Sequence, residues 1–529
     1  MNDIDRRAFL ISAIFGIAFG MGLGTGYSAD RYETVFPHRL SVVLVTGLLI
    51  IVSATALYLI LTRSRTHSFR ISDEVLPEHL HAKRTFAYQI IILMCWLPVF
   101  LGVYPGFFVY DAVDEVRSVF SGVYTTHHPI LHTFLLGESV CFGGRVLQNY
   151  NYGIAIYIVL QMLIASFIFA RVVVRIGRGR LIALAWYGLF PTVVMFALCS
   201  VKDTAFALAI LCVAILIRDI LDQNMRNDQS VIRFLILNVA LTLMMLFRNN
   251  GIYMFVIFAV CVSVYMMVTH HAFRRQMLIC LVTAGFMYVI INSALFHLAD
   301  AYKDGVQEVL TVPIQQLAHT YSEHRDELSD DEKATVKEII PVEFIDAYRF
   351  TLSDPVKMGF DNEAFKSDPD RYISVWAKLF ARYPKDYIDA WIGTCYGFFY
   401  PFTVVNVYEG NTEWTFTYTE SSYFGYETEY PGERHSLIPV IDRFYRWLSL
   451  DDDIQRIPVL SLPFSMGVMF WVYALCLAYL IYRRKYSVVL GLVLPFSGIL
   501  TFLLGPTFLP RYTVFWWFMF PWTLNYLRE

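Results

Sequence analysis

Charged side chains are scarce in this sequence. Asp, Glu, Lys and Arg make up only 16% of the 529 residues, whereas 57% of the residues are hydrophobic. Soluble domains contain about 45–50% apolar residues. This chain instead repeats apolar runs of about 17–22 residues, the length needed to cross a bilayer. The composition excludes a soluble globular protein and predicts an all-α polytopic membrane protein.

Several motifs are also missing. The eight cysteines show no metal-binding spacing, so we interpret them as small apolar residues of the interior. The first apolar run lacks a small-x-small cleavage site, which favours a helix over a signal peptide. There is no motif of a nucleophilic Ser or Cys and no internal repeat. The missing repeat argues against a secondary transporter, since such proteins are commonly built from inverted repeats.

Hydropathy and charge together predict the topology. If the N-terminus is inside, the inner segments carry 20 Lys and Arg residues and the short outer connections carry 7. Because positive residues are retained in the cytoplasm, both termini are expected there. Two apolar stretches, 129–142 and 386–405, do not fit this alternation and are interpreted as interfacial or re-entrant pieces on the outer side. The twelve predicted transmembrane helices lie near residues 8–26, 39–61, 86–106, 151–170, 181–199, 204–220, 232–247, 251–268, 277–298, 458–481, 487–504 and 509–526.

The charge distribution also predicts the domain organisation. Residues 299–457 contain 29 acidic residues but only 15 Lys and Arg, and their mixed helical patterns indicate an extracytoplasmic, mostly helical α or α+β domain. Residues 1–298 form the first membrane domain, with nine spans and a first outer loop at 107–150. Residues 458–529 carry spans ten to twelve.

Polar residues gather at the outer ends of these spans. The third span ends in GFFVYDAVDEV, which brings Asp111, Asp114 and Glu115 to the outer membrane surface. Ionisable groups at this depth are costly and usually face a polar cavity rather than lipid. The other polar residues predicted at the same level are His127, His128, His132, Lys202, Asp203, Arg248, Asn249, Asn250, Arg511 and Tyr512.

Such a set supports group transfer from a lipid phosphate. Lys202, Arg248 and Arg511 are suited to neutralise a phosphate or pyrophosphate at the interface, and a nearby carboxylate can take the proton of an acceptor hydroxyl. Several of these residues also have a structural interpretation. Asp114 and Glu115 fit a solvated helix face, Lys202 and Asp203 a structural ion pair, and Arg248 a side chain that reaches the interface.

Six short motifs resemble the GT-C superfamily of polytopic glycosyltransferases. They are FFVYDAVDE, HHPILHTFLLG, SVKDTAFALAI, LFRNNGIY, VPIQQLAH and LPRYTVFW, in that order between Tyr104 and Trp517. The chain is most similar to an uncharacterised bacterial family of GT-C-like integral membrane proteins. The resemblance implies a lipid-linked sugar donor, extracytoplasmic chemistry, and Asp111 as the general base. The paired-acid spacing of better-studied members is not reproduced, which leaves Asp111 or Asp114 as the base and metal dependence open.

We therefore expect a plasma-membrane glycosyltransferase, inverting at the sugar carbon. Its partners would be a polyprenyl-phosphate sugar donor, a glycan, lipid or protein acceptor, and membrane lipids, with no nucleic acid. No cofactor is certain, and a divalent metal ion, Mg²⁺ or Mn²⁺, is compatible with the acids. Gln315 and Gln316 are placed in the acceptor cleft or, equally, at a helix cap or turn. The alternatives are a flippase for a lipid-linked saccharide and a non-catalytic subunit of an envelope complex.

Overall fold

The protein is built from helices. The computed structural model describes residues 3–36, 39–63, 78–177, 179–221, 227–405, 431–450 and 453–527. Within these residues there is no β-strand, and the only extended pairings are three isolated bridges. Seven helices are long and apolar enough to cross a membrane. The prediction of an all-α membrane protein is therefore confirmed.

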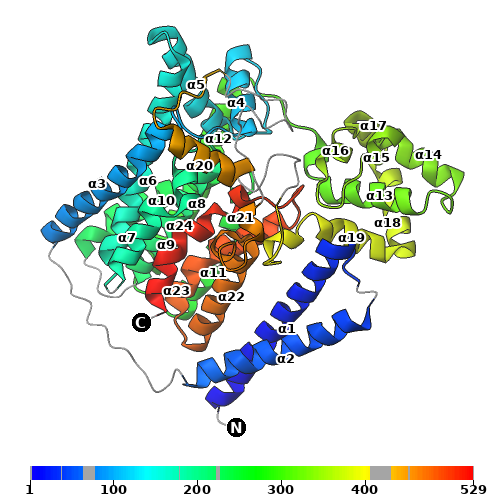
Figure 1. The fold of residues 1–529 in the computed structure, drawn as a ribbon, viewed down its shortest axis with the longest axis horizontal. Coiled ribbons are helices and arrows are strands. Elements are labelled where there is room, and N and C mark those ends of the chain that lie inside the picture. Colours follow the sequence, from blue (N-terminus) through cyan, green and yellow to red (C-terminus); the bar gives the residue numbers. More distant parts are fainter. Residues whose placement is uncertain are drawn as a thin grey trace.

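Every predicted span coincides with helical structure in the described part of the chain. The seven long apolar helices are α1 (Asp3–Tyr32), α2 (Leu40–Arg63), α3 (Glu78–Gly102), α6 (Tyr150–Arg175), α9 (Lys202–Leu221), α11 (Gly251–Val268) and α12 (Arg274–Leu298). Four shorter ones are α10 (Asn227–Phe247), α22 (Met466–Tyr482), α23 (Tyr486–Phe502) and α24 (Val514–Tyr526). Most residues of α9 are buried, because it packs against α10, α23 and α24 in the centre of the body (Figure 1).

The predicted span 181–199 is broken rather than straight. It consists of α7 (Arg180–Leu189) and α8 (Pro191–Ala197), whose axes differ by 56°. Pro191 has no N–H to continue the first helix, and it restricts Phe190 to an extended conformation (φ −68°, ψ 121°). Proline is nevertheless suited to the first turn of the helix that follows.

The apolar stretch 129–142 forms α5 (Ile130–Val146), which packs against α6 and against the short helix α4 (Tyr110–Ser121). The stretch 386–405 divides between α19 (Pro384–Gly393) and the 3₁₀ turn η2 (Tyr396–Phe398).

The residues that follow α12 form a lobe with its own hydrophobic core. That core contains Ile314, Tyr321, Val336, Val356 and Leu379 among others, and the lobe projects from the helical body (Figure 1). Its helices are α13 (Thr311–Glu323), α14 (Asp330–Ile339), α15 (Val342–Ile345), α16 (Asp354–Lys357), α17 (Asn362–Ser367), α18 (Pro369–Arg382) and α19.

Later residues of the 299–457 region pack elsewhere. Cys395, Tyr396 and Phe398 belong to the core of the helical body. The helix α20 (Pro439–Leu450) lies against α3 and contributes Tyr445 and Leu448 to the same core.

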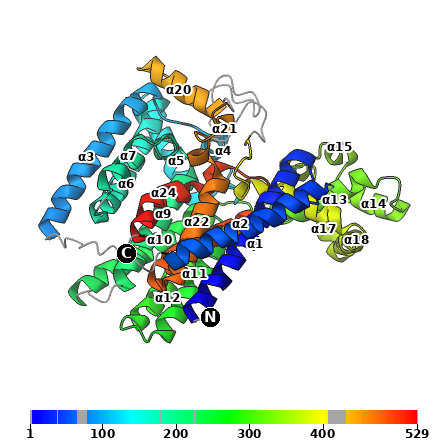
Figure 2. The same ribbon diagram turned by 60° about the horizontal axis from the view of Figure 1, so that its bottom comes forward.

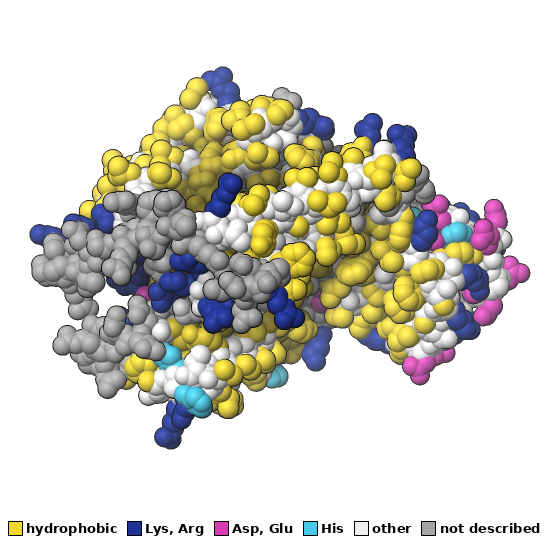
Figure 3. Space-filling view, turned by 90° about the horizontal axis from the view of Figure 1, so that it is seen from below, with side chains coloured by type: hydrophobic (Ala, Val, Ile, Leu, Met, Phe, Trp, Pro, Cys, Tyr) yellow, Lys and Arg dark blue, Asp and Glu magenta, His cyan; other side chains and the backbone are white. Residues whose placement is uncertain are grey.

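The N-terminal hairpin of α1 and α2 lies on the outside of the helical body (Figure 2). The two helices approach closely at Gly16, where a Cβ atom would lie 2.5 Å from the Cβ of Ala54, as small residues allow in membrane helix pairs. The hairpin reaches the lobe through Thr34, whose hydroxyl donates a hydrogen bond to Asp389 Oδ2 over 2.8 Å. Figure 3 shows apolar side chains over much of the body, while acidic side chains gather on the lobe.

Candidate functional site

Five chain segments meet at one end of the helical body. They are the first turn of α4, the loop before α5, the first turn of α9, the loop between α10 and α11, and the 3₁₀ turn η4 (Pro510–Thr513) between α23 and α24. These segments carry most of the polar residues singled out from the sequence. The structure brings six charged side chains from them into one buried cluster: Asp111, Glu115, Lys202, Asp203, Arg248 and Arg511.

Backbone hydrogen bonds fix two of these segments side by side. Phe107 N donates to Leu198 O over 2.9 Å, and Ser200 N donates to Phe107 O over 3.1 Å, which forms a short parallel bridge. Gly106 precedes this bridge with φ +147°, and a Cβ atom there would lie 2.7 Å from Ile158 Cγ1. Only glycine suits that conformation and that contact. The bridge places the first turn of α4 beside the first turn of α9.

Asp111 is held between two cations. Its Oδ2 atom accepts hydrogen bonds from Lys202 Nζ over 2.7 Å and from Arg511 Nη1 over 2.5 Å, and only 6% of the residue is exposed. Burial by itself raises the pKa of this carboxyl group. The adjacent positive charges of Arg511 and Lys202 outweigh burial, so that the pKa lies well below its usual value.

The ion pairs continue from Arg511 to a second arginine. Arg511 Nη1 lies 3.9 Å from Asp203 Oδ2, and the other oxygen of Asp203 accepts a hydrogen bond from Arg248. The guanidinium carbon of Arg248 lies 4.6 Å from the ring centre of Tyr512 and 4.8 Å from that of Phe502. These aromatic rings stabilise the cation.

Glu115 lies behind Asp111 and is 1% exposed. Its Oε2 atom accepts a hydrogen bond from His132 Nδ1, and its Oε1 atom lies 3.7 Å from Lys202 Nζ. Burial raises the pKa of Glu115, but His132 and Lys202 outweigh it and the pKa is lowered. His132 Nε2 in turn lies 2.9 Å from the hydroxyl of Tyr157, which donates to Gln161 Oε1 over 3.4 Å.

His132 was singled out from the sequence, but neither Tyr157 nor Gln161 was. The sequence did contain a pattern that could have identified Tyr157 and Gln161. They are two polar residues four positions apart within an apolar span, and they therefore share one face of the helix. Gln161 also donates hydrogen bonds to Ala197 O over 3.0 Å and to Cys199 O over 2.8 Å. It thereby ties α6 to the segment that precedes Lys202.

The two neighbouring histidines have different surroundings. His128 Nδ1 accepts a hydrogen bond from Lys202 Nζ over 2.9 Å. Burial and the charge of Lys202 lower its pKa to about 3, so the ring is neutral at physiological pH. His127 Nδ1 instead lies 2.8 Å from Asp304 Oδ2, and this contact raises the pKa of His127.

Asp114, Gln315 and Gln316 are candidate residues whose contacts lie elsewhere than in the charged cluster. Asp114 is 47% exposed at its side chain and pairs with Arg117 on the same helix, over 3.4 Å. Gln315 and Gln316 lie inside the lobe, where their side-chain amides donate to backbone carbonyls over 2.6 Å and 3.0 Å.

The two asparagines border the cluster. Asn249 Nδ2 donates to Thr126 O over 3.0 Å, which connects the α10–α11 loop to the loop before α5. Asn250 is the N-cap residue of α11.

These features define a class of protein. It is a helical membrane protein whose helix ends enclose a buried cluster of three cations and three carboxylates. The chain belongs to a family of unknown function (DUF6020), which it matches over residues 120–507. The matched region contains Lys202, Asp203 and Arg248, whereas Asp111 and Arg511 lie just outside it. Neither a curated protein nor a solved structure matches the chain.

Proposed function

We propose that this protein is a GT-C-type membrane glycosyltransferase that moves a sugar from a polyprenyl-phosphate donor to a cell-envelope acceptor. One observation carries the proposal: Lys202 Nζ and Arg511 Nη1 lie within 2.7 Å and 2.5 Å of the same carboxylate oxygen of Asp111. Two cationic donors that converge on one oxygen of a carboxylate are already arranged to hold one oxygen of a phosphate. The displaced carboxylate would remain beside the reacting sugar.

The proposed reaction is a single displacement at the anomeric carbon of the sugar. The acceptor hydroxyl oxygen forms a bond to this carbon, while the bond from the carbon to the phosphate oxygen breaks. The electron pair of that bond leaves with the polyprenyl phosphate. The hydroxyl proton passes to the carboxylate of Asp111, which acts as general base. Lys202, Arg511 and Arg248 stabilise the negative charge on the leaving phosphate.

The donor itself would activate the base in this scheme. A carboxylate paired with two cations is weakly basic, as the low pKa of Asp111 indicates. A phosphate that competes for Lys202 and Arg511 removes these partners and adds negative charge nearby. Both changes raise the pKa of Asp111 toward its ordinary value and favour uptake of a proton. Proton transfer would therefore be coupled to the presence of the donor.

The proposed topology has twelve crossings, both termini in the cytoplasm and the lobe outside. A Cys introduced at exposed Ser374 on α18 is expected to react with a membrane-impermeant maleimide in intact cells. A Cys at exposed Ala272, between α11 and α12, is expected to react only after lysis. The eight native cysteines are buried or partly buried, so the unmodified protein serves as the background control. The reverse labelling pattern would put the cluster on the cytoplasmic side and contradict the proposal.

The function is tested by mass spectrometry of envelope glycans and lipid-linked sugars in a deletion strain. If the protein is a transferase, the deletion strain should lose one glycan residue and accumulate the corresponding polyprenyl-phosphate monosaccharide. The wild-type chain should reverse both changes, whereas Asp111→Asn should reverse neither. Accumulation of a complete oligosaccharide on its lipid would instead indicate a flippase. Unchanged glycans and lipids would contradict both functions.

A further inference from the structure

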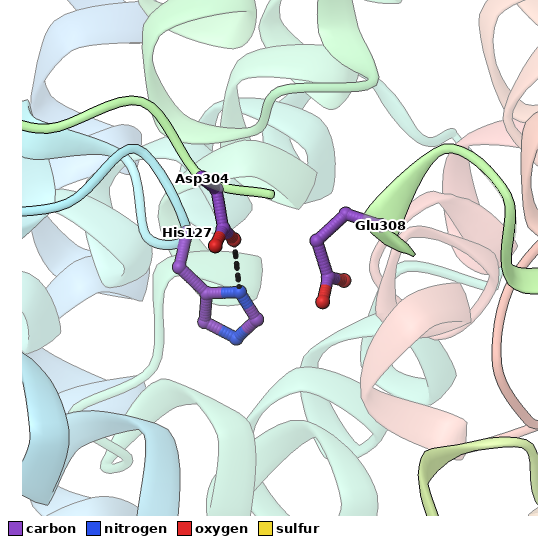
Figure 4. Close-up of side chains that lie close together, drawn as sticks. All are labelled: His127, Asp304 and Glu308. Atoms are coloured by element: carbon purple, nitrogen blue, oxygen red, sulfur yellow. Dashed lines mark hydrogen bonds and ion pairs between the residues drawn. The ribbon is translucent and has the colours of Figure 1, made fainter. Parts of the chain in front are cut away.

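A second polar cluster lies where the lobe joins the helical body. His127 comes from the loop between α4 and α5, while Asp304 and Glu308 come from the segment between α12 and α13. One ligand atom from each of the three side chains lies within 4.8 Å of the other two. Figure 4 shows the imidazole of His127 beneath the carboxylate of Asp304, with the carboxylate of Glu308 facing them from the other side.

Backbone hydrogen bonds hold the first two residues in place. Tyr302 N donates to Tyr124 O over 2.9 Å, and Thr126 N donates to Tyr302 O over 3.0 Å. Asp304 N also donates to the hydroxyl of Thr126 over 2.8 Å. The two segments are therefore in register before any ligand binds, and little ordering of the backbone is required.

The charge around the cluster is suited to a cation. Lys357 Nζ donates to Glu308 Oε2 over 2.9 Å and lies 3.1 Å from Asp354 Oδ1. Lys357 is therefore shared between Glu308 and Asp354. A divalent ion between Asp304 and Glu308 would add positive charge beside both of these carboxylates.

We propose that His127, Asp304 and Glu308 bind one divalent transition-metal ion, Zn²⁺ or Mn²⁺. One imidazole and two carboxylates form a ligand set that these ions accept, whereas Mg²⁺ and Ca²⁺ favour oxygen ligands alone. Ligand atoms around a tetrahedral Zn²⁺ lie about 3.3 Å apart, given bonds of about 2.0–2.2 Å. His127 Nδ1 and Asp304 Oδ2 lie 2.8 Å apart, so the ion would replace the proton that they share. A fourth coordination position would remain for water or an anionic oxygen.

Such an ion would connect the lobe to the helical body through coordinate bonds, at a position beside the charged cluster. The next residue after His127 is His128, which accepts the hydrogen bond of Lys202. A metal bond to His127 would therefore fix the loop that holds Lys202 toward Asp111. Metal binding is a property of these three side chains alone, and it does not depend on the function proposed above.

The test is Zn²⁺ binding to the purified full-length protein in detergent, after chelator treatment and dialysis against micromolar Zn²⁺. Elemental mass spectrometry is expected to find about one ion per chain in the wild type, and the background value in His127→Ala, Asp304→Asn and Glu308→Gln. Excess Mg²⁺ is not expected to displace the ion.

His324→Ala is the matched control from the same lobe. His324 also contacts two carboxylates, but Asp386 binds its Nε2 over 2.8 Å while Glu327 lies 3.3 Å from its Nδ1. The two acids thus lie on different ring nitrogens and do not converge on one point, so this variant should bind as much Zn²⁺ as the wild type. The Asn and Gln variants keep side-chain volume, and thermal unfolding without metal verifies that they fold. Wild-type stoichiometry in Glu308→Gln, or equal loss in His324→Ala, would overturn the proposal.

Discussion

Asp111→Asn should lower the rate of sugar transfer by about 10²–10⁴-fold, the range typical of a lost general base. The amide has nearly the same size as the carboxylate but cannot accept the proton of the acceptor hydroxyl. Binding of the donor should survive, and it is measured separately with a lipid phosphate in nanodiscs. It should even become tighter, because Lys202 and Arg511 no longer bind a carboxylate at 2.7 Å and 2.5 Å. Loss of turnover with preserved or improved donor affinity is therefore the expected signature.

The matched control is Asp114→Asn, three residues along the same helix. The side chain of Asp114 is 47% exposed and pairs with Arg117, so its substitution should leave turnover within about twofold of wild type, as expected for a surface site. Glu115→Gln should be intermediate, since Glu115 touches Lys202 and His132 without reaching the solvent. If Asp114→Asn loses turnover while Asp111→Asn keeps a normal rate, the general base would be Asp114 instead of Asp111. Normal rates in all three variants would exclude this mechanism.

Arg511→Lys and Arg248→Lys should each lower kcat/KM for the donor by about 10–100-fold, which corresponds to about 1.4–2.8 kcal/mol. Lysine keeps the charge but loses the planar guanidinium and its several N–H donors. Arg511 contacts both Asp111 and Asp203 through its Nη1 atom, and a bound phosphate would also need the neighbouring N–H donors of the guanidinium, which lysine lacks. Arg248 needs the guanidinium because its central carbon lies 4.8 Å and 4.6 Å from the ring centres of Phe502 and Tyr512, where a planar cation interacts better than an ammonium. Steady-state kinetics with varied donor concentration measures both effects.

Arg117→Lys provides the control for the arginine variants. Arg117 is 53% exposed at its side chain and pairs with Asp114 over 3.4 Å on the same helix, so kcat/KM should stay within about twofold of wild type, as expected for a surface site. Unchanged kinetics in both buried-site variants would mean that Arg248 and Arg511 only balance the buried acids. Reduced thermal stability without a change in kcat/KM would lead to the same conclusion.

The distinction between neighbouring acids illustrates how far the sequence could lead. On a helix with about 3.6 residues per turn, Asp114 and Glu115 are each within about 60° of Asp111 around the axis. Periodicity therefore leaves both on roughly the same face. The packing of α4 against α5 decides that Glu115 is buried against His132 while Asp114 stays partly exposed. Such a choice depends on a partner surface that comes from a different part of the chain.

The two glutamines show the same limit. Gln315 and Gln316 lie near the start of the lobe in the sequence. From the sequence alone, they fit equally well in an acceptor cleft and in a helix cap or turn. Their hydrogen bonds go to Arg349 O and Tyr387 O, which are 34 and 71 residues away. Backbone carbonyls are present at every position, so no residue type in the sequence marks these particular acceptors.

The sequence by itself determined the membrane class, the positions of the helices and the set of charged residues that interrupt apolar runs. These follow from local composition, since about 20 apolar residues cross a bilayer and an isolated charge within them is costly. Only the tertiary structure decided which charges meet. Asp111 pairs with Lys202 and Arg511 across separations of 91 and 400 residues, and the Pro191 break, the Glu115–His132 pair and the His127 cluster likewise depend on neighbours in space. Ion pairs and ligand sets are selected by the packing of helix ends, a long-range property that no local pattern encodes.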